Sequence, residues 1–360
     1  MAINDFSSFE AGTIFNPIAR PLETPTAQAG YVSLDYPSRL GAMTLDPSKI
    51  TDNNNMVFPA GQISFCVGVY KHVEATLNDS GEITVADDTP RPAIVRHAGL
   101  IMKKALGFEE GVHLSVRPDR DLRHSGLGSS GSTLAGTAAA VNELFGNPLG
   151  ALELARFCSH NYGEEIDEDK ERLVSVQSIG GSAMCGLLRG GLLIVSGEAV
   201  PIYSAELDES LQVVIGVPSD YRPLDAEELI RAEVDNIKGF QDSGEKHAQE
   251  VAYRLVHKVL PGLVLGDVNP CKDLIFDFRW NMGSVRNCSF AYPGIVDLAE
   301  SLRDLGEDER ATIIAPSSVG PAFFSLTKDP EYITHRFSEL DMKTFTTNIH
   351  NGRYIVQEKR

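Results

Sequence analysis

The sequence has little of what nucleic-acid-binding and disulfide-stabilised proteins require. Its 32 Lys and Arg residues stand against 50 Asp and Glu residues, so the formal net charge is −18 and a strongly basic face is not expected. Because a nucleic-acid backbone is bound through such a face, we expect no nucleic-acid partner. The five cysteines are widely spaced and include no C-x-x-C pair, which indicates neither a disulfide framework nor a zinc site.

Long hydrophobic runs are also lacking. No uncharged apolar run approaches the roughly 18 residues that a membrane helix needs, and residues 1–10 contain no cationic segment followed by an apolar one. We therefore expect a cytoplasmic protein with no membrane partner. The chain has 360 residues, 42% of them hydrophobic, which suits two domains of about 100–200 residues each. We expect these domains at 1–200 and 201–360.

Hydrophobic periodicity locates the main helices and strands. Helical spacing predicts helices over 92–106, 132–145 and 152–162, and a long helical stretch over 225–259. Runs of β-branched and aromatic residues predict strands over 64–70, 112–116, 187–196, 213–217 and 311–315.

A loop rich in glycine and serine precedes the alanine-rich helix over 132–145. Glycine lets the backbone approach a ligand closely, and a helix N-terminus offers unpaired N–H groups with a partial positive charge. The hydroxyl groups of the loop are further donors. We therefore predict a binding site for a phosphorylated small molecule, formed by Gly126, Leu127, Gly128, Ser129, Ser130, Gly131, Ser132 and Thr133.

Two other interpretations of this loop stay open. Gly126, Gly128 and Gly131 match G-x-G-x-x-G, but a dinucleotide site also needs an apolar strand directly before it and an acidic residue about 20 residues later. The chain lacks that context. The loop could also be a plain glycine-rich turn in which Ser132 caps the helix.

Two motifs resemble a known family. Gly126–Ser130 is similar to the second motif of the GHMP kinase superfamily, and Ser317-Ser318-Val319-Gly320-Pro321 resembles its C-terminal glycine motif. Two serines, one further residue and then Gly-Pro is the form found in β-ribofuranosylaminobenzene 5'-phosphate synthase and related C-nucleoside synthases. Segments 38–46 and 177–191 resemble further blocks of that branch in the same order.

The resemblance implies a fold and an activity. The fold would be α+β and GHMP-kinase-like, with an N-terminal domain like ribosomal protein S5 domain 2 and a C-terminal ferredoxin-like domain. The enzyme would be a glycosyltransferase of C-nucleoside antibiotic biosynthesis. It would transfer ribose 5-phosphate from phosphoribosyl pyrophosphate (PRPP) to a ring carbon of an aromatic carboxylate, and release carbon dioxide and pyrophosphate. A homodimer is implied, Mg²⁺ is allowed, and no organic cofactor is expected.

The branch also suggests roles for single residues. Asp46 is a candidate catalytic residue and Mg²⁺ ligand, although a turn residue before Pro47 is equally consistent with its position. The acceptor or the ribose would be bound by Arg39, Gln177, Ser178, Ser317, Ser318 and Gly320. The loop departs from the branch at 130–132, which leaves the acceptor open between an aminobenzoate and an amino-pyrazole dicarboxylate.

Two alternative functions remain. An ATP-dependent small-molecule kinase of the same superfamily would use Gly126–Ser130 equally well, because such enzymes act mainly by positioning phosphates. A catalytically silent binding protein is the third alternative, but it would not need to keep the small residues of the loop.

Overall fold

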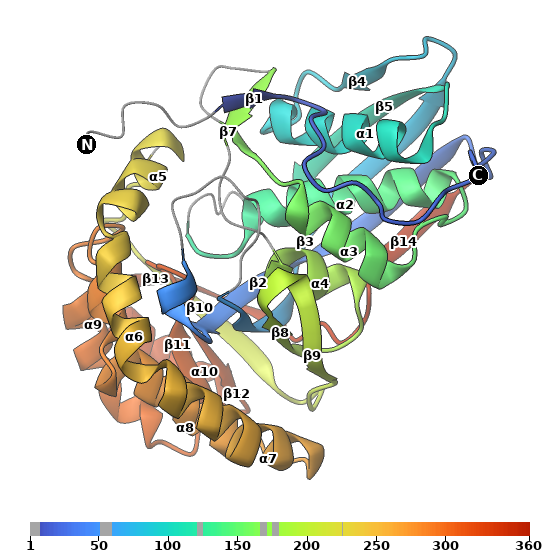
Figure 1. The fold of residues 1–360 in the computed structure, drawn as a ribbon. Coiled ribbons are helices and arrows are strands. Elements are labelled where there is room, and N and C mark those ends of the chain that lie inside the picture. The colour runs from blue at the N-terminus through green and yellow to red at the C-terminus, as the bar shows by residue number, and fades with distance from the viewer. Residues whose placement is uncertain (1–7, 51–59, 121–124, 166–170, 175–179, 225) are drawn as a thin grey trace.

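The computed structural model describes residues 8–50, 60–120, 125–165, 171–174, 180–224 and 226–360 (Figure 1). It contains both helices and antiparallel sheets, which confirms the α+β class. Two large sheets carry most of the chain, and a third, small sheet joins β1 (Ser8–Glu10), β7 (Arg172–Val174) and β6 (Glu164–Glu165).

The first large sheet has seven strands and is antiparallel except at one edge. Five strands lie in the order β14-β2-β3-β5-β4, β8 pairs with the far end of β3, and β9 pairs with β8. Only β4 and β5 run parallel among these pairs. The strands are β2 (Tyr31–Thr44), β3 (Gln62–Asn78), β4 (Ile83–Val85), β5 (Gly111–Pro118), β8 (Leu192–Ser196), β9 (Val200–Ala205) and β14 (Ile355–Lys359).

Four helices cover one face of this sheet (Figure 1). They are α1 (Pro92–Leu106), α2 (Ser129–Leu144), α3 (Ala151–His160) and α4 (Gly180–Leu187). Small residues let α2 lie close to the sheet: a Cβ on Gly136 would stand only 3.0 Å from Cβ of Tyr36. Every residue of α2 from Gly131 to Leu144 is buried as a result. The alanine-rich sequence therefore marks a central helix of the core.

The second large sheet is antiparallel, in the order β11-β12-β10-β13. Its strands are β10 (Gln212–Pro218), β11 (Ala311–Pro316), β12 (Phe323–Thr327) and β13 (Met342–Asn348). The helices of this part are α5 (Ala226–Asp235), α6 (Ile237–Arg254), α7 (Leu260–Val264), α8 (Asn269–Phe276), α9 (Ile295–Ser301) and α10 (Pro330–Ser338). Short 3-10 turns occupy Pro47–Lys49, Gly197–Ala199, Ser284–Cys288 and Arg303–Gly306, and π-helical turns occupy Leu255–Val259 and Asp277–Asn281.

One apolar cluster joins the two sheets. Leu40 and Phe65 of the first sheet pack with Ile215 and Phe324 of the second, and the rings of Phe65 and Phe324 are 5.8 Å apart. The chain also crosses back, because β14 at its C-terminal end pairs with β2. The division into 1–200 and 201–360 stays a prediction, and the structure shows that the strand 355–359 is part of the first sheet.

Most predicted elements have their expected type. The helix over 92–106 is confirmed at both ends, whereas the helix predicted from 132 begins three residues earlier, at Ser129. The strand predicted over 187–196 begins only at Leu192, because α4 extends to Leu187. The stretch over 225–259 is divided into α5, α6 and a π-helical turn.

The expected thiol state is found, since all five cysteines are free and buried. Among the described residues, no helix has the length and apolarity to cross a membrane.

Candidate functional site

The predicted phosphate loop (residues 126–133) lies against the turn at Ser317 and against Ser182 of α4, and its glycines shape it. Gly126 has φ = +96° and Gly128 has φ = +68°, a left-handed backbone that glycine adopts without strain. A Cβ on Gly126 would overlap the carbonyl oxygen of Ser317, and one on Gly128 would overlap the hydroxyl of Ser182 and lie 2.9 Å from Cγ of Arg39. Only glycine therefore fits at these two positions.

The first turn of α2 leaves backbone donors open. Gly128 precedes the helix and provides no side-chain cap. The amide of Ser132 bonds to the carbonyl of Gly128, whereas the amides of Ser129, Ser130 and Gly131 donate to no other described residue. Three amides without a partner among the described residues, at the positive end of a helix, suit an anion, and the phosphate site itself stays a prediction.

The loop hydroxyls point in different directions. Ser132 donates to the carbonyls of Gly128 and Ser129 at 3.0 Å each, and Thr133 donates to that of Ser129 at 3.0 Å. Because Ser132 donates to carbonyls and accepts no amide hydrogen, it does not cap the helix. The hydroxyl of Ser130 contacts the guanidinium of Arg91 and bonds with Tyr162, and Leu127 anchors the loop in the cluster between the sheets.

The C-terminal turn holds the phosphate loop against β2. The hydroxyl of Ser317 accepts from the amide of Gly41 at 3.1 Å and donates to the carbonyl of Gly126 at 2.7 Å. The amide of Ser318 donates to the carbonyl of Gly41 at 2.8 Å, and the amide of Gly320 donates to that of Ser317 at 2.8 Å. The two motifs recognised in the sequence are thus in direct contact.

Arg39 lies at the same junction. Its guanidinium donates to the hydroxyl of Ser318 at 2.5 Å and to that of Ser182, in α4, at 3.2 Å. Burial lowers the pKa of Arg39, but an arginine guanidinium keeps its charge in proteins. No ion pair joins Arg39 to any carboxylate in the described part of the chain. Its positive charge is therefore available to an anion in the loop.

Arg91 is a neighbour that the sequence analysis missed. It precedes Pro92 at the start of α1, and its guanidinium contacts the hydroxyl of Ser130 and, at 2.9 Å, the carboxylate of Glu164. The hydroxyl of Tyr162 donates to the other oxygen of Glu164. No motif marks this arginine, because its partners lie 39 and 73 residues away in the chain.

Lys71 is a buried cation in β3 that was also missed. Only 5% of the residue is exposed, and its ammonium has no hydrogen bond or ion pair to another residue that the structure describes. The pKa of Lys71 is lowered to about 8, mainly by burial and in addition by the nearby charge of Arg91, while Asp119 opposes the shift. A buried ammonium without a paired carboxylate is costly, which points to an anion that is bound during function.

Asp46 has a clear structural role. Its Oδ1 accepts from the amide of Ser48 at 3.0 Å and from the hydroxyl of Ser48 at 2.6 Å, so it caps the turn Pro47–Lys49. Within the described residues, no three His, Cys, Asp or Glu side chains are grouped to hold a metal ion. The assignment of Asp46 to catalysis or Mg²⁺ stays a prediction. Gln177 and Ser178, which were predicted to bind the acceptor or the ribose, lie outside the described residues.

Comparisons with known proteins agree with the fold. Residues 93–167 match the family described as the GHMP kinases N terminal domain, and this range includes the phosphate loop. A homoserine kinase from Thermoplasma volcanium is 27% identical over 202 residues, which are 55% of this chain and 59% of that protein. The match therefore spans less than two thirds of the relative.

Solved structures resemble the whole chain. A homoserine kinase from Cytophaga hutchinsonii has a TM-score of 0.59 at 16% identity, over 92% of this chain and 98% of its own. A mevalonate diphosphate decarboxylase from Staphylococcus aureus has a TM-score of 0.66 at 13% identity, over 91% and 98%. The chain has the GHMP-kinase-like α+β fold, and these findings support the GHMP kinase superfamily without supporting the synthase branch.

The predicted activity is corrected by these relatives. The similar proteins include homoserine kinases and a mevalonate kinase, whereas the sequence analysis predicted a PRPP-dependent glycosyltransferase of C-nucleoside biosynthesis. The predicted enzyme class was therefore wrong, and so were the predicted substrates, PRPP and an aromatic carboxylate. The physical reason lies in Ser317, whose hydroxyl joins Gly41 to Gly126. The two-serine turn holds the loop in place, and its sequence therefore does not identify the phosphorylated donor.

Proposed function

We propose that the protein is a small-molecule kinase that transfers the γ-phosphoryl group of ATP to a hydroxyl group. The observation that carries this proposal is the start of α2, where the amides of Ser129, Ser130 and Gly131 are open. In phosphoryl transfer, charge spreads over the oxygens of the moving group, and fixed donors and cations stabilise it. The site offers such donors beside Arg39 and near the buried Lys71.

The residues have distinct roles in this proposal. The open amides and the hydroxyls of Ser129 and Ser130 bind the phosphate chain, and Arg39 holds the loop and adds charge. Arg91 exchanges its contact with Ser130 for a phosphate oxygen when ATP binds. Mg²⁺ usually takes one or two protein carboxylates together with phosphate oxygens, and Glu164, linked to Ser130 through Arg91, fits this role. Bound Mg²⁺ would neutralise phosphate charge.

For the acceptor we propose a small hydroxylated amino acid, with L-homoserine as the first compound to test. This proposal is supported by two homoserine kinases: the relative that matches 55% of the chain, and the solved structure whose fold match covers 92% of it. The homodimer and the cytoplasmic location stay predictions from the sequence, and light scattering would test the former.

The test measures ADP release with ATP, Mg²⁺ and L-homoserine, and detects the product by ³¹P NMR. The double variant S129A/S130A should lose most activity because it removes two phosphate donors. The control S338A removes an exposed hydroxyl on α10 that donates only within its own helix, and it should keep full activity. The proposal is wrong if no alcohol yields ADP and ATP does not raise the melting temperature of the protein.

A further inference from the structure

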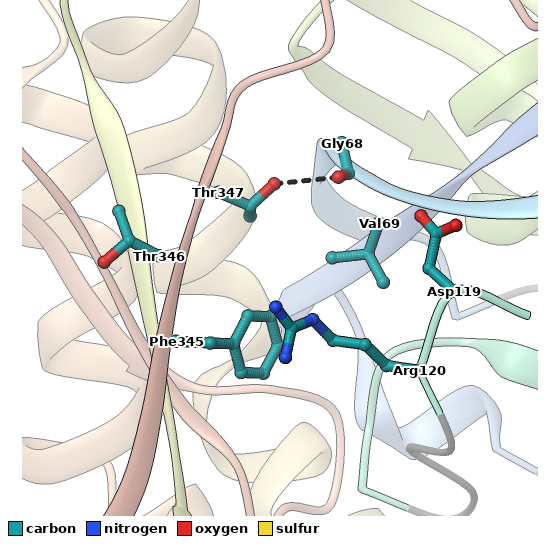
Figure 2. A pocket seen from close by; sticks show the side chains of 7 residues that line it. All are labelled: Gly68, Val69, Asp119, Arg120, Phe345, Thr346 and Thr347. Carbon is teal, nitrogen blue, oxygen red and sulfur yellow. Dashed lines mark hydrogen bonds between the residues drawn. The ribbon is translucent and has the colours of Figure 1, made fainter.

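A polar pocket lies at the junction of the two large sheets, and none of the phosphate-loop residues lines it. Its volume is about 460 Å³, within the usual range for small-molecule sites. It is lined by Gly68, Val69, Asp119, Arg120, Phe345, Thr346 and Thr347. β3 and the end of β5 form one wall, and β13 forms the other (Figure 2).

The walls are held close together by a glycine. The hydroxyl of Thr347 donates to the carbonyl of Gly68 at 2.8 Å, which joins β13 to β3. A Cβ on Gly68 would stand 3.3 Å from that hydroxyl oxygen and 3.2 Å from the hydroxyl of Tyr70. The pocket is therefore a built feature of the junction between the sheets.

Arg120 is the cation of this pocket. Figure 2 shows its side chain crossing toward Phe345, with the guanidinium 4.7 Å from the ring centroid. Stacking uses the face of a guanidinium and leaves its N–H groups, which lie in the plane, free to donate. In the described part of the chain, no carboxylate or carbonyl accepts from Arg120.

The adjacent carboxylate is already occupied. Asp119 accepts from Nε2 of His72 at 2.5 Å and from the amide of Tyr70 at 2.8 Å. The other ring nitrogen of His72 contacts Asp35 at 2.5 Å, so the ring lies between two carboxylates. Burial lowers the pKa of His72, but these two hydrogen bonds outweigh burial and raise it overall. Figure 2 shows the Asp119 carboxylate pointing away from the Arg120 guanidinium.

We propose that this pocket binds a small anion bearing a carboxylate or phosphate group, through the unpaired N–H groups of Arg120. A guanidinium presents two parallel donors that match either oxyanion, and Phe345 keeps the group in place. Arg120 is the one cationic side chain among the residues that line the pocket, and the neighbouring carboxylate of Asp119 is bonded to His72 and to the amide of Tyr70. This inference does not depend on the proposed kinase activity.

Isothermal titration of the full chain tests the inference, with inorganic phosphate in one arm and succinate in the other. R120Q replaces the guanidinium by a neutral amide on a shorter, still polar side chain and so removes the charge. The matched control R117Q removes an equal charge from a nearby exposed residue that pairs with Glu74. We expect R120Q to weaken the binding of at least one probe by about tenfold or more, and R117Q to change it little.

The outcomes show which chemical group the pocket binds, and they separate this inference from the proposed kinase activity. A loss confined to phosphate or to succinate in R120Q identifies the bound group and supports the site. Equal binding by R120Q and R117Q, or no binding of either probe, overturns it. F345A provides a second variant in which binding should weaken because the guanidinium loses its stacking partner. Phosphate that binds only at the phosphate loop would persist in R120Q, and a failure of the kinase assay would leave these titrations unchanged.

Discussion

Replacement of Ser317 by alanine should show how the two motifs depend on each other. The Ser317 side chain is fully buried, and its hydroxyl bonds to both Gly41 and Gly126. In S317A the buried amide of Gly41 loses its acceptor, which costs about 1–3 kcal/mol. The carbonyl of Gly126 is only partly buried and can bind water, so losing its hydrogen bond from Ser317 costs about 0.5–1.5 kcal/mol. Together we expect about 1.5–4.5 kcal/mol of destabilisation.

Urea denaturation measures this change, and S284A is its matched control. Ser284 is also buried, but its hydroxyl has no hydrogen-bond partner among the described residues, so removing it should not destabilise the fold. S317A should in addition raise the KM for ATP, because Gly126 is no longer held. Equal stability of S317A and S284A would refute the conclusion that the hydroxyl joins the strand, the loop and the turn.

Three further predictions concern the loop and two buried basic groups. G128A should bind ATP at least about tenfold more weakly by titration, because its Cβ would displace Ser182 and φ is positive. K71M should stabilise the fold at pH 7 by up to about 3 kcal/mol in urea, since an ammonium with a lowered pKa is unfavourable there, and should weaken ATP binding. His97 has a pKa lowered to about 4 by burial, so the unfolded chain binds more protons between pH 4 and 6.5. Stability should rise by about 3 kcal/mol across that window, and H97Q should flatten the rise in denaturation curves.

The parts of the site that are contiguous in the chain could be predicted. The start of α2 follows from glycines before an alanine-rich periodic run, and this local pattern is independent of the rest of the fold. The helix over 92–106 was located at both ends because Pro92 opens it and Gly107 closes it with φ = +74°.

The parts that depend on distant contacts could not be predicted. Arg91 reaches Ser130 across 39 residues, and Arg39 reaches Ser182 across 143. Lys71 is buried because the sheet and its helices enclose it, and an isolated lysine in a strand has no feature that indicates this. The sequence left two roles open for Asp46, a catalytic or Mg²⁺-binding residue and a turn residue before Pro47, and the structure shows it capping that turn.

The sequence by itself determined local features of this protein: a glycine-rich helix start suited to phosphate, and the type of most helices and strands. These depend on residues within a few positions of one another, whose backbone preferences act without tertiary contacts. Only the tertiary structure decided that Ser317 holds the loop, that Arg39 and Lys71 have no ion-paired carboxylate among the described residues, and that Arg120 lies in a separate pocket. Burial and charge pairing arise when distant segments pack together, and no local pattern encodes them.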